Sequence, residues 1–170
     1  MERRAVSLMF ELAGDDDAPA LAALHSAAAE HLTRTFGHGH WSSSAGEHGV
    51  RRGIMSSKVI VARGADGIAG ALRLATKKPW AIEPKFFAPV SRPLYLLDMA
   101  VSPAAQRHGI GRRLIEEALL VAKVVAGDAI RLDAYDASAG AGEFYRKCGF
   151  REVGRAEYRH VPLIYFERKL

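Results

Sequence analysis

The sequence predicts an α+β fold, that is, an α/β three-layer arrangement with helices on both faces of a mixed central sheet. Three observations support this fold class. The length of 170 residues suits one domain with a single core, 49% of the residues are hydrophobic, and strand-like and helix-like patterns follow one another along the chain. The expected order is strand, helix, a candidate short helix, three strands, helix, strand, helix and one or two strands. We therefore predict a single domain over residues 1–170.

The first fifty residues contain one strand pattern and one helix pattern. Apolar residues alternate along Ala5–Leu12, which indicates a half-buried strand. Asp15-Asp16-Asp17 and an early proline are typical of a helix start, because they suit its unpaired N–H groups. Apolar residues then recur at helical spacing, and this helix is expected to end before Gly37. A loop rich in Gly, Ser and His follows over 37–49 and leads into a candidate short helix before Met55.

The middle of the chain predicts a hairpin followed by a long irregular segment. Lys58–Arg63 and Ile68–Ala75 are expected strands, and Asp66-Gly67 between them is a strong hairpin-turn pattern. Lys77–Pro93 breaks the pattern with four prolines and several aromatic residues. Because irregular segments of this length in a small domain are usually functional or disordered, and the aromatic content argues against disorder, we expect a functional role for it.

The last third of the chain alternates between strands and helices. Leu94–Val101 is the most apolar strand and is expected to be central. A helix is predicted over Gly109–Ala126, a strand over Ala129–Tyr135 and a short helix over Ser138–Lys147. Arg151–Arg168 is expected to supply one or two final strands, with the proline of this segment between them or at an edge.

Composition excludes several classes of protein. The net charge of +5 and the pI of about 9.6 attract anions, but no polybasic tail or nucleic-acid motif is present, so no nucleic-acid partner is expected. No apolar run approaches the length of a membrane helix, and the N-terminus does not have the pattern of a signal peptide, so we expect no membrane partner. The single cysteine is compatible with a reducing compartment, and a cytoplasmic location is expected.

No zinc-like spacing of Cys and His is present, so no metal site is expected. His38 and His40, with His31 and His48 farther away, could in principle gather around a metal ion. A polar loop that happens to contain histidines is the better interpretation of this segment.

A glycine-containing loop after the central strand predicts an anion site. Gly109 and Gly111 stand at the expected start of a helix, where unpaired N–H groups and the helix dipole attract phosphate. Arg107, His108 and the arginines after Gly111 add positive charge at the same point, which favours a pyrophosphate ligand. The spacing differs from the loop of nucleotide triphosphatases and from the dinucleotide fingerprint. The alternative is a turn that merely begins a helix.

Two motifs together resemble the GNAT superfamily of acyl-CoA-dependent N-acyltransferases. The first is Gln106-Arg107-His108-Gly109-Ile110-Gly111, and the second is Phe144-Tyr145-Arg146-Lys147-Cys148-Gly149-Phe150, with a predicted strand between them. The resemblance is strongest over Leu94–Arg151. It implies a GNAT-like, mostly antiparallel sheet whose central strands splay apart.

The resemblance also implies where acetyl-CoA, the acetyl-donor substrate, would bind. Backbone N–H groups of the glycine loop would hold the pyrophosphate, and the cofactor-binding set in this loop is Gln106, Arg107, His108, Gly109, Ile110, Gly111 and Arg112. The central strand would pair with the pantetheine arm through Met99, Ala100 and Val101. Ser138 stands where relatives often carry the asparagine that begins the late helix, and it could cap that helix or contact pantetheine.

Two residues are the candidate catalytic groups. Tyr145 matches the tyrosine that would protonate the departing thiolate, although it could simply pack beside its aromatic neighbours. Asp98 is the candidate base for the amine, because a carboxylate in an apolar strand needs a role or a partner. The alternative for Asp98 is a structural pair with an arginine or a cap on a strand bulge. Glu83 and His40 are weaker candidates, and Cys148 is expected to be a buried structural thiol.

The resulting prediction is an N-acetyltransferase that moves the acetyl group to the primary amine of a small molecule, amino acid or peptide by direct attack. His31–Met55 and Lys77–Pro93 are expected to select the acceptor, and their scarcity of acidic residues argues against polyamines and aminoglycosides. The alternatives are a GNAT-type toxin that acetylates aminoacyl-tRNA and a non-catalytic acyl-CoA-binding domain. An exposed C-terminal strand could form a homodimer by pairing across two chains.

Overall fold

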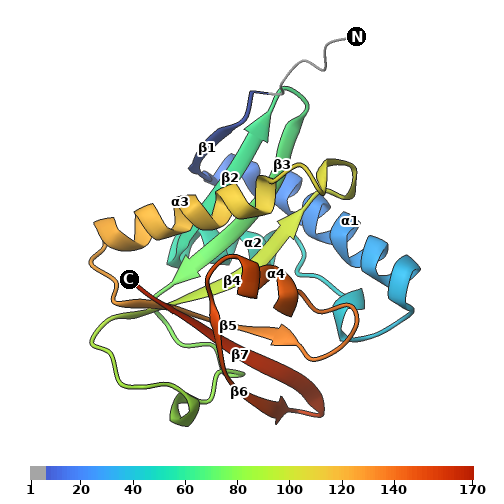
Figure 1. Ribbon diagram of the computed structural model, residues 1–170. Coiled ribbons are helices and arrows are strands. Elements are labelled where there is room, and N and C mark those ends of the chain that lie inside the picture. Colours follow the sequence, from blue (N-terminus) through green and yellow to red (C-terminus); the bar gives the residue numbers. More distant parts are fainter. Residues whose placement is uncertain (1–6) are drawn as a thin grey trace.

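A computed structural model describes residues 7–170 and contains one seven-stranded sheet in the order β1-β2-β3-β4-β5-β7-β6 (Figure 1). The strands are β1 Met9–Leu12, β2 Lys58–Gly64, β3 Gly67–Ala75, β4 Pro93–Val101, β5 Ala129–Tyr135, β6 Arg151–Tyr158 and β7 Val161–Lys169. The α-helices are α1 Ala18–Phe36, α2 Glu47–Ser56, α3 Ile110–Val124 and α4 Gly142–Lys147. The predicted α+β class and the predicted order of elements are confirmed.

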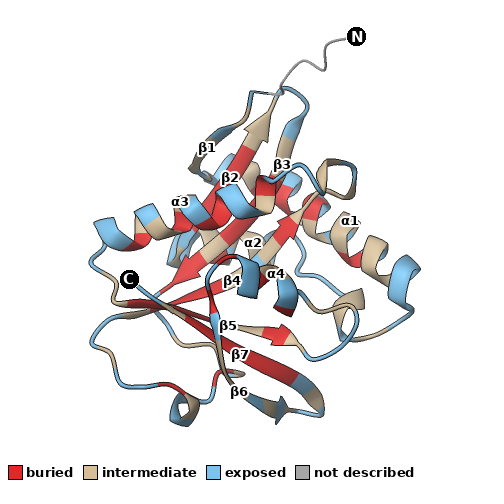
Figure 2. Cartoon of the chain, viewed as in Figure 1, coloured by how far each residue is buried: buried red, intermediate tan, exposed pale blue. Residues whose placement is uncertain are grey.

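The helices cover both faces of the sheet, with α3 and α4 in front and α1 and α2 behind in Figure 1. Because side chains alternate along each strand, β2 serves two cores. Ile60 packs with the buried face of α3, whereas Val59 and Val61 pack with α1. Burial is accordingly concentrated on the strands and on the inner face of α3 (Figure 2).

The sheet is antiparallel except between β4 and β5. These two strands are parallel and pair only through Pro93–Tyr95 and Ala129–Arg131. Beyond that point they diverge, as the ribbon of Figure 1 shows, so the two central strands are splayed. The splay leaves one edge of β4 without a partner strand in the second half of its length.

Of three predicted details, the first is tested only in part and the other two are wrong. β1 begins at Met9, and the Ala5 and Val6 of the predicted strand lie outside the described residues. The late helix begins at Gly142 instead of Ser138, because a turn closed by a hydrogen bond from Gly140 N–H to Ala137 O precedes it. The C-terminal strand β7 is not an exposed edge, because it pairs with β5 on one side and β6 on the other. β7 therefore offers no free edge for pairing between two chains, and the homodimer stays a prediction.

The long segment 77–93 packs against the C-terminal half of the sheet. Phe87 and Ile82 are buried beside Tyr165 of β7, and the Tyr165 hydroxyl donates to the Ala81 carbonyl. Arg131 of β5 donates to the Ala88 carbonyl at 2.8 Å. The segment is thus a covering layer on the same face as α1 and α2. No helix within residues 7–170 combines the length and the apolar composition needed to cross a membrane.

Candidate active site

The splay of β4 and β5 opens into a cavity of about 420 Å³. Its walls come from α1, the loop before α2, α2 itself, β3, β4, β5 and the β5–α4 connection. The charged or titratable side chains along its lining are His25, Arg73, Asp98, Asp133, Tyr135 and Tyr145. Small and apolar residues make up most of the remainder.

The glycine loop at the end of β4 presents unpaired backbone N–H groups. Arg113 N–H is the first to donate within α3, to the Gly109 carbonyl at 3.1 Å. The N–H groups of residues 107–112 have no acceptor within the described part of the chain. Gly109 has φ of +79° and Arg107 has φ of +63°, and such left-handed residues curve successive N–H groups toward a common point. These N–H groups are available to an anion, and anion binding at this loop stays a prediction.

The side chains of this loop divide into two groups. Arg107, His108 and Arg112 are exposed and leave their positive or titratable groups toward solvent at the loop. Gln106 instead faces inward, and its amide donates to the Val101 carbonyl at 3.3 Å, which ties the loop to β4. Arg113 stacks on Phe10 of β1, with 4.3 Å between the guanidinium carbon and the ring centroid. Gln106 and Arg113 therefore support the loop without facing an anion.

The two glycines of the loop have different roles. An added Cβ at Gly109 would meet no atom, so the reason for a glycine at this position is its positive φ. A Cβ on Gly111 would lie 3.2 Å from the Phe144 ring and 3.3 Å from the Met99 methyl group. Gly111 is therefore needed for the close packing of α3 against α4 and β4, in addition to any role in ligand approach. Ile110 is buried in the core and anchors the start of α3.

The predicted pantetheine-binding strand has a free edge. Ala100 and Val101 pair with Ala71 and Gly70 of β3, but β4 has no pairing with β5 beyond Tyr95. Met99 lies at a break in the β3–β4 register and lines the cavity. An extended ligand could add to this edge as a strand does.

Tyr145 projects from α4 to the floor of the cavity. Its side chain packs against Phe144, Phe150 and Phe166, and its hydroxyl donates to Met99 Sδ at 3.8 Å. Burial, with a smaller contribution from the negative charge of Asp133, raises the pKa of the Tyr145 phenol well above its usual value. The phenol is therefore protonated at neutral pH, and its partner is only a weak sulfur acceptor.

Asp98 lies on β4 at the register break, on the opposite side of the strand from Met99. Its carboxylate accepts a hydrogen bond from Arg73 Nε at 2.9 Å, and 55% of its side chain is exposed. The backbone of Asp98 has φ of +52°. The structure therefore shows both features of the alternative interpretation, the arginine pair and the strand bulge.

Asp133 is a cavity residue that the sequence interpretation missed. It lies on β5, and burial raises the pKa of its carboxyl, with no arginine or lysine pairing with it among the described residues. Its negative charge in turn contributes to raising the pKa values of Tyr135 and Tyr145, so it lies close to both. Its position 12 residues before Tyr145, in a strand that is mostly apolar apart from Arg131, was the available signal.

His25 of α1 is a second residue that was missed. Burial lowers the pKa of its imidazole, Arg73 lowers it further, and the opposing effect of Asp98 is smaller than that of burial. The ring is therefore neutral at pH 7 beside the Asp98–Arg73 pair. Sequence reasoning had no signal for it, because a lone histidine on a helix is indistinguishable from a surface residue.

One wall of the cavity comes from α1 and the loop before α2. Trp41 packs edge-on against Tyr135, with ring centroids 6.0 Å apart, and the Tyr135 hydroxyl donates to the His40 carbonyl at 3.1 Å. Leu32 and Ala28 of α1 continue this wall. The predicted role of His31–Met55 at the site is consistent with this lining. Segment 77–93, including Glu83, supplies none of the cavity's lining residues.

The β5–α4 connection closes the cavity next to Tyr145. Ala139, Gly140 and Ala141 line the cavity, whereas Ser138 is exposed in the preceding turn. Ser138 therefore does not cap α4, which removes one of its two predicted roles, and a contact with pantetheine stays a prediction. Close packing explains Gly140, because a Cβ there would overlap the Tyr135 carbonyl oxygen.

Gly140→Ala is expected to displace this connection. The overlap is with backbone, which cannot rotate away, so we expect a loss of about 1–3 kcal/mol in the free energy of unfolding and a higher KM for acetyl-CoA. Gly14→Ala is the matched control, because no atom lies within 4 Å of its added methyl group. Chemical denaturation and steady-state kinetics measure both effects. Equal behaviour of the two variants would contradict the packing argument.

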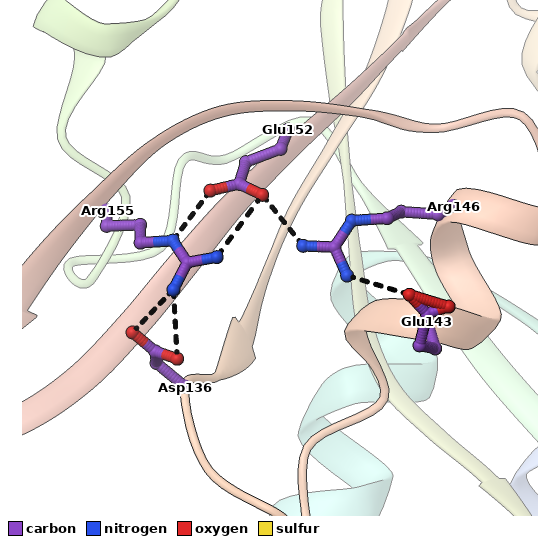
Figure 3. Close-up of polar contacts among 5 residues, drawn as sticks. All are labelled: Asp136, Glu143, Arg146, Glu152 and Arg155. Carbon is purple, nitrogen blue, oxygen red and sulfur yellow. Dashed lines mark hydrogen bonds and ion pairs between the residues drawn. The ribbon is translucent and has the colours of Figure 1, made fainter.

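An ion-pair network fixes α4 to the end of β5 and to β6 (Figure 3). Arg155 contacts Asp136 at 3.3 Å and Glu152 at 2.7 Å, and Arg146 of α4 contacts Glu152 at 2.7 Å. Hydrogen bonds from Arg155 and Arg146 lower the pKa of Glu152 to about 2. The Glu152 carboxylate therefore ties together two segments near Tyr145. It holds α4 through Arg146 and the end of β5 through Arg155 and Asp136.

The remaining candidates have no catalytic arrangement. Cys148 is buried, and burial raises the pKa of its thiol, which disfavours a reactive thiolate. Within the described range, no three His, Cys, Asp or Glu side chains gather where they could hold a metal ion.

Comparison with known proteins adds independent findings. Residues 55–152, more than half of the chain, match the family described as acetyltransferase (GNAT) domain. Among solved structures, the chain is similar to a GNAT-family acetyltransferase from Listeria monocytogenes 4b F2365, with a TM-score of 0.76, 18% identity and coverage of 100% of this chain and 99% of that chain. The sequence matches no curated protein.

Two further solved structures share the fold. The ribosomal-protein-alanine N-acetyltransferase from Brucella melitensis has a TM-score of 0.72 and 18% identity, covering 96% of this chain and 100% of that chain. The PaiA N-acetyltransferase from Thermoplasma acidophilum, solved in complex with coenzyme A, has a TM-score of 0.72 and 15% identity, covering 96% of this chain and 99% of that chain. At such low identities, these two structures show that the fold is shared and nothing more.

Proposed function

Because the chain belongs to the GNAT acetyltransferase family, we propose that it binds acetyl-CoA between β4 and β5 and transfers the acetyl group to a primary amine by direct attack. The observation that carries this proposal is the continuity of the free β4 edge with the unpaired N–H groups of residues 107–112. An anion site and an open strand edge in line suit a pyrophosphate joined to an extended arm. The relative from Thermoplasma acidophilum, solved with coenzyme A, supports this ligand.

In this proposal, the thioester lies where β4 and β5 separate, with Tyr145 on the side of α4. Attack by the amine forms a tetrahedral intermediate, and its collapse breaks the carbon–sulfur bond. The protonated phenol of Tyr145 then gives its proton to the departing thiolate. The hydroxyl is free to turn toward a ligand sulfur, since its present acceptor, Met99 Sδ at 3.8 Å, is weak.

We assign the proton acceptor for the amine to Asp133 in preference to Asp98. Asp98 already accepts a hydrogen bond from Arg73 Nε at 2.9 Å, so its carboxylate is engaged in a structural pair. Asp133 has no such partner among the described residues, and burial raises the pKa of its carboxyl toward the working pH. Asp133 lines the cavity together with Tyr135, the residue of β5 that packs against Trp41.

The acceptor class follows from the charges of the cavity. The Arg73 and Asp98 charges compensate each other, and His25 is neutral, which leaves Asp133 as the uncompensated charge among the described lining residues. One carboxylate suits one ammonium group, whereas a polyamine or an aminoglycoside would need several. Together with the apolar wall at Trp41, this favours a small molecule, amino acid or peptide N-terminus with a single amine beside an apolar group.

Thiol release from acetyl-CoA across a panel of amines tests the function. We expect acceptor-dependent release by the wild type and a fall in kcat of about 10- to 100-fold in Tyr145→Phe. The expected fall in kcat is smaller than the largest effects of general acid catalysis. The reason is that a thiol with a pKa near about 8.5 already leaves readily as the thiolate. Tyr158→Phe, on β6 and away from the cavity, is the matched control.

The outcomes separate the alternatives. Retained acetyl-CoA affinity with lower kcat in Tyr145→Phe supports the proposed role. Tight acetyl-CoA binding with no turnover on any amine would favour a macromolecular acceptor or a non-catalytic domain. Absence of acetyl-CoA binding would disprove the proposal.

A further inference from the structure

We propose that Arg73 and Asp98 are positioning residues that hold the bulge of β4 in place and so align the thioester with Tyr145. This inference rests on the proposed function and says which side chains hold β4 in place. Arg73 acts through Asp98, and Asp98 acts through the backbone that continues into Met99. Neither residue then needs to exchange a proton during the reaction.

β4 contains a bulge opposite Leu72 of β3. Arg73 pairs with Leu97 and Ala71 pairs with Ala100, so Leu72 alone stands opposite both Asp98 and Met99. The extra residue bends the strand at the point where it faces the cavity. Asp98 has φ of +52°, a conformation that is costly for a residue with a side chain and persists only where its surroundings enforce it.

A contact across the bulge holds Asp98 in this conformation. The Asp98 carboxylate accepts from Arg73 Nε at 2.9 Å across the same bulge. Arg73 is itself confined, because its side chain packs against Gly53 of α2, where a Cβ would lie 3.1 Å from Arg73 Cδ. Its Nη1 also lies 3.5 Å from Ser57 Oγ, just beyond the end of α2. The bulge is therefore tied through one side chain to a helix that packs on the sheet.

The bulge is connected to the proposed reaction centre through Met99. Asp98 and Met99 are consecutive and project from opposite faces of β4, so the bulge sets the direction of both. Met99 receives the Tyr145 hydroxyl at 3.8 Å, and its methyl group packs near Gly111 at the start of α3. A shift of the bulge would move the β4 backbone relative to both Tyr145 and the glycine loop. Misplacement by about 1 Å can cost about 100-fold in rate.

The test compares variants that break the pair with one that preserves it. Asp98→Gly deletes the carboxylate but tolerates positive φ, Arg73→Met deletes the partner, and Asp98→Asn keeps both an acceptor oxygen and tolerance of positive φ. Arg63→Met is the control, because Arg63 forms ion pairs with Glu11 and Asp17 away from the cavity. The readouts are kcat with its pH profile, Kd for acetyl-CoA, and the ¹³C resonance of the bound acetyl carbonyl.

We expect Asp98→Gly and Arg73→Met to lower kcat by about 10- to 100-fold and to move the carbonyl resonance. Asp98→Asn is expected to retain most activity, the wild-type resonance and the wild-type pH profile. If Asp98→Asn instead matches Asp98→Gly and loses the acidic limb of the profile, Asp98 is a base and the proposal is wrong. Unchanged kcat and resonance in Arg73→Met would also overturn it. The carbonyl resonance is measured with acetyl-CoA alone and needs no acceptor amine. If the proposed function is wrong, the wild type will not bind acetyl-CoA, and this outcome is distinct from a failure of the positioning role.

Discussion

Asp133→Asn is expected to lower kcat/KM by about 100- to 10,000-fold, the usual range for loss of a positioned general base. The amide cannot take the proton from the attacking ammonium group at any pH. In the wild type, the ionised carboxylate is the active form. Activity should therefore fall as the pH drops through the raised pKa of Asp133, and this acidic limb should disappear in the variant.

The same substitution should leave the fold intact. Because burial raises the pKa of Asp133 above its unfolded value, the ionised carboxylate destabilises the folded state at neutral pH. Removing that charge is expected to keep the free energy of unfolding at pH 7 the same or to increase it. Thermal unfolding at pH 7 measures this directly, and the combination of lost activity and preserved stability marks a functional carboxylate.

Asp66→Asn is the matched control for Asp133→Asn. Asp66 lies in the exposed turn between β2 and β3, where asparagine also suits the turn. Wild-type activity in Asp133→Asn would contradict the assignment and move the role of base to Asp98 or to the neutral His25. Their pH profiles would then separate these two residues.

Glu167→Gln is expected to have the largest effect on stability, a loss of about 3–5 kcal/mol in the free energy of unfolding. Glu167 of β7 pairs with Arg131 of β5 at 2.8 Å, and the two side chains are only 3% and 8% exposed. Arg131 also stacks over Phe87 at 4.6 Å. Loss of the carboxylate leaves a buried guanidinium without a counter-charge beneath segment 77–93.

Chemical denaturation measures this loss, and thermal unfolding should shift downward by roughly 10 °C. Glu157→Gln is the control, since Glu157 is exposed and forms only a surface contact with His160 at 3.4 Å. In Arg131→Leu/Glu167→Leu, both charges are removed together, so we expect a smaller loss than the sum of the single variants. A change below about 1 kcal/mol in Glu167→Gln would show that the pair is dispensable.

Local patterns in the sequence were enough for most of the fold. Helical periodicity with an acidic start fixed α1, and the Asp66-Gly67 turn placed β2 beside β3. These patterns depend on neighbours within a few residues, so they are readable without tertiary information. The start of α4 was not readable, because the turn before it is selected by the close contact of Gly140 with the Tyr135 carbonyl.

The candidate site was predictable only where it is continuous in the sequence. The loop at residues 106–112 and Tyr145 belong to local motifs, and the structure places both beside the splayed strands. Asp133, His25 and Arg73 come from β5, α1 and β3, and only the packing of these elements brings them to one cavity. The same packing gave Asp98 an arginine partner and directed segment 77–93 to the other end of the sheet.

The amino-acid sequence alone thus determined the order of the elements, the place of the glycine loop at the start of α3 and the place of Tyr145 on α4, because each depends on short-range spacing. Tertiary packing determined the surroundings of each carboxylate. Asp98 and Asp133 are chemically equivalent in the sequence. In the structure, Asp98 pairs with Arg73 across a bulge, whereas Asp133 is buried on β5 with no such partner among the described residues, and the different roles proposed for them rest on this difference.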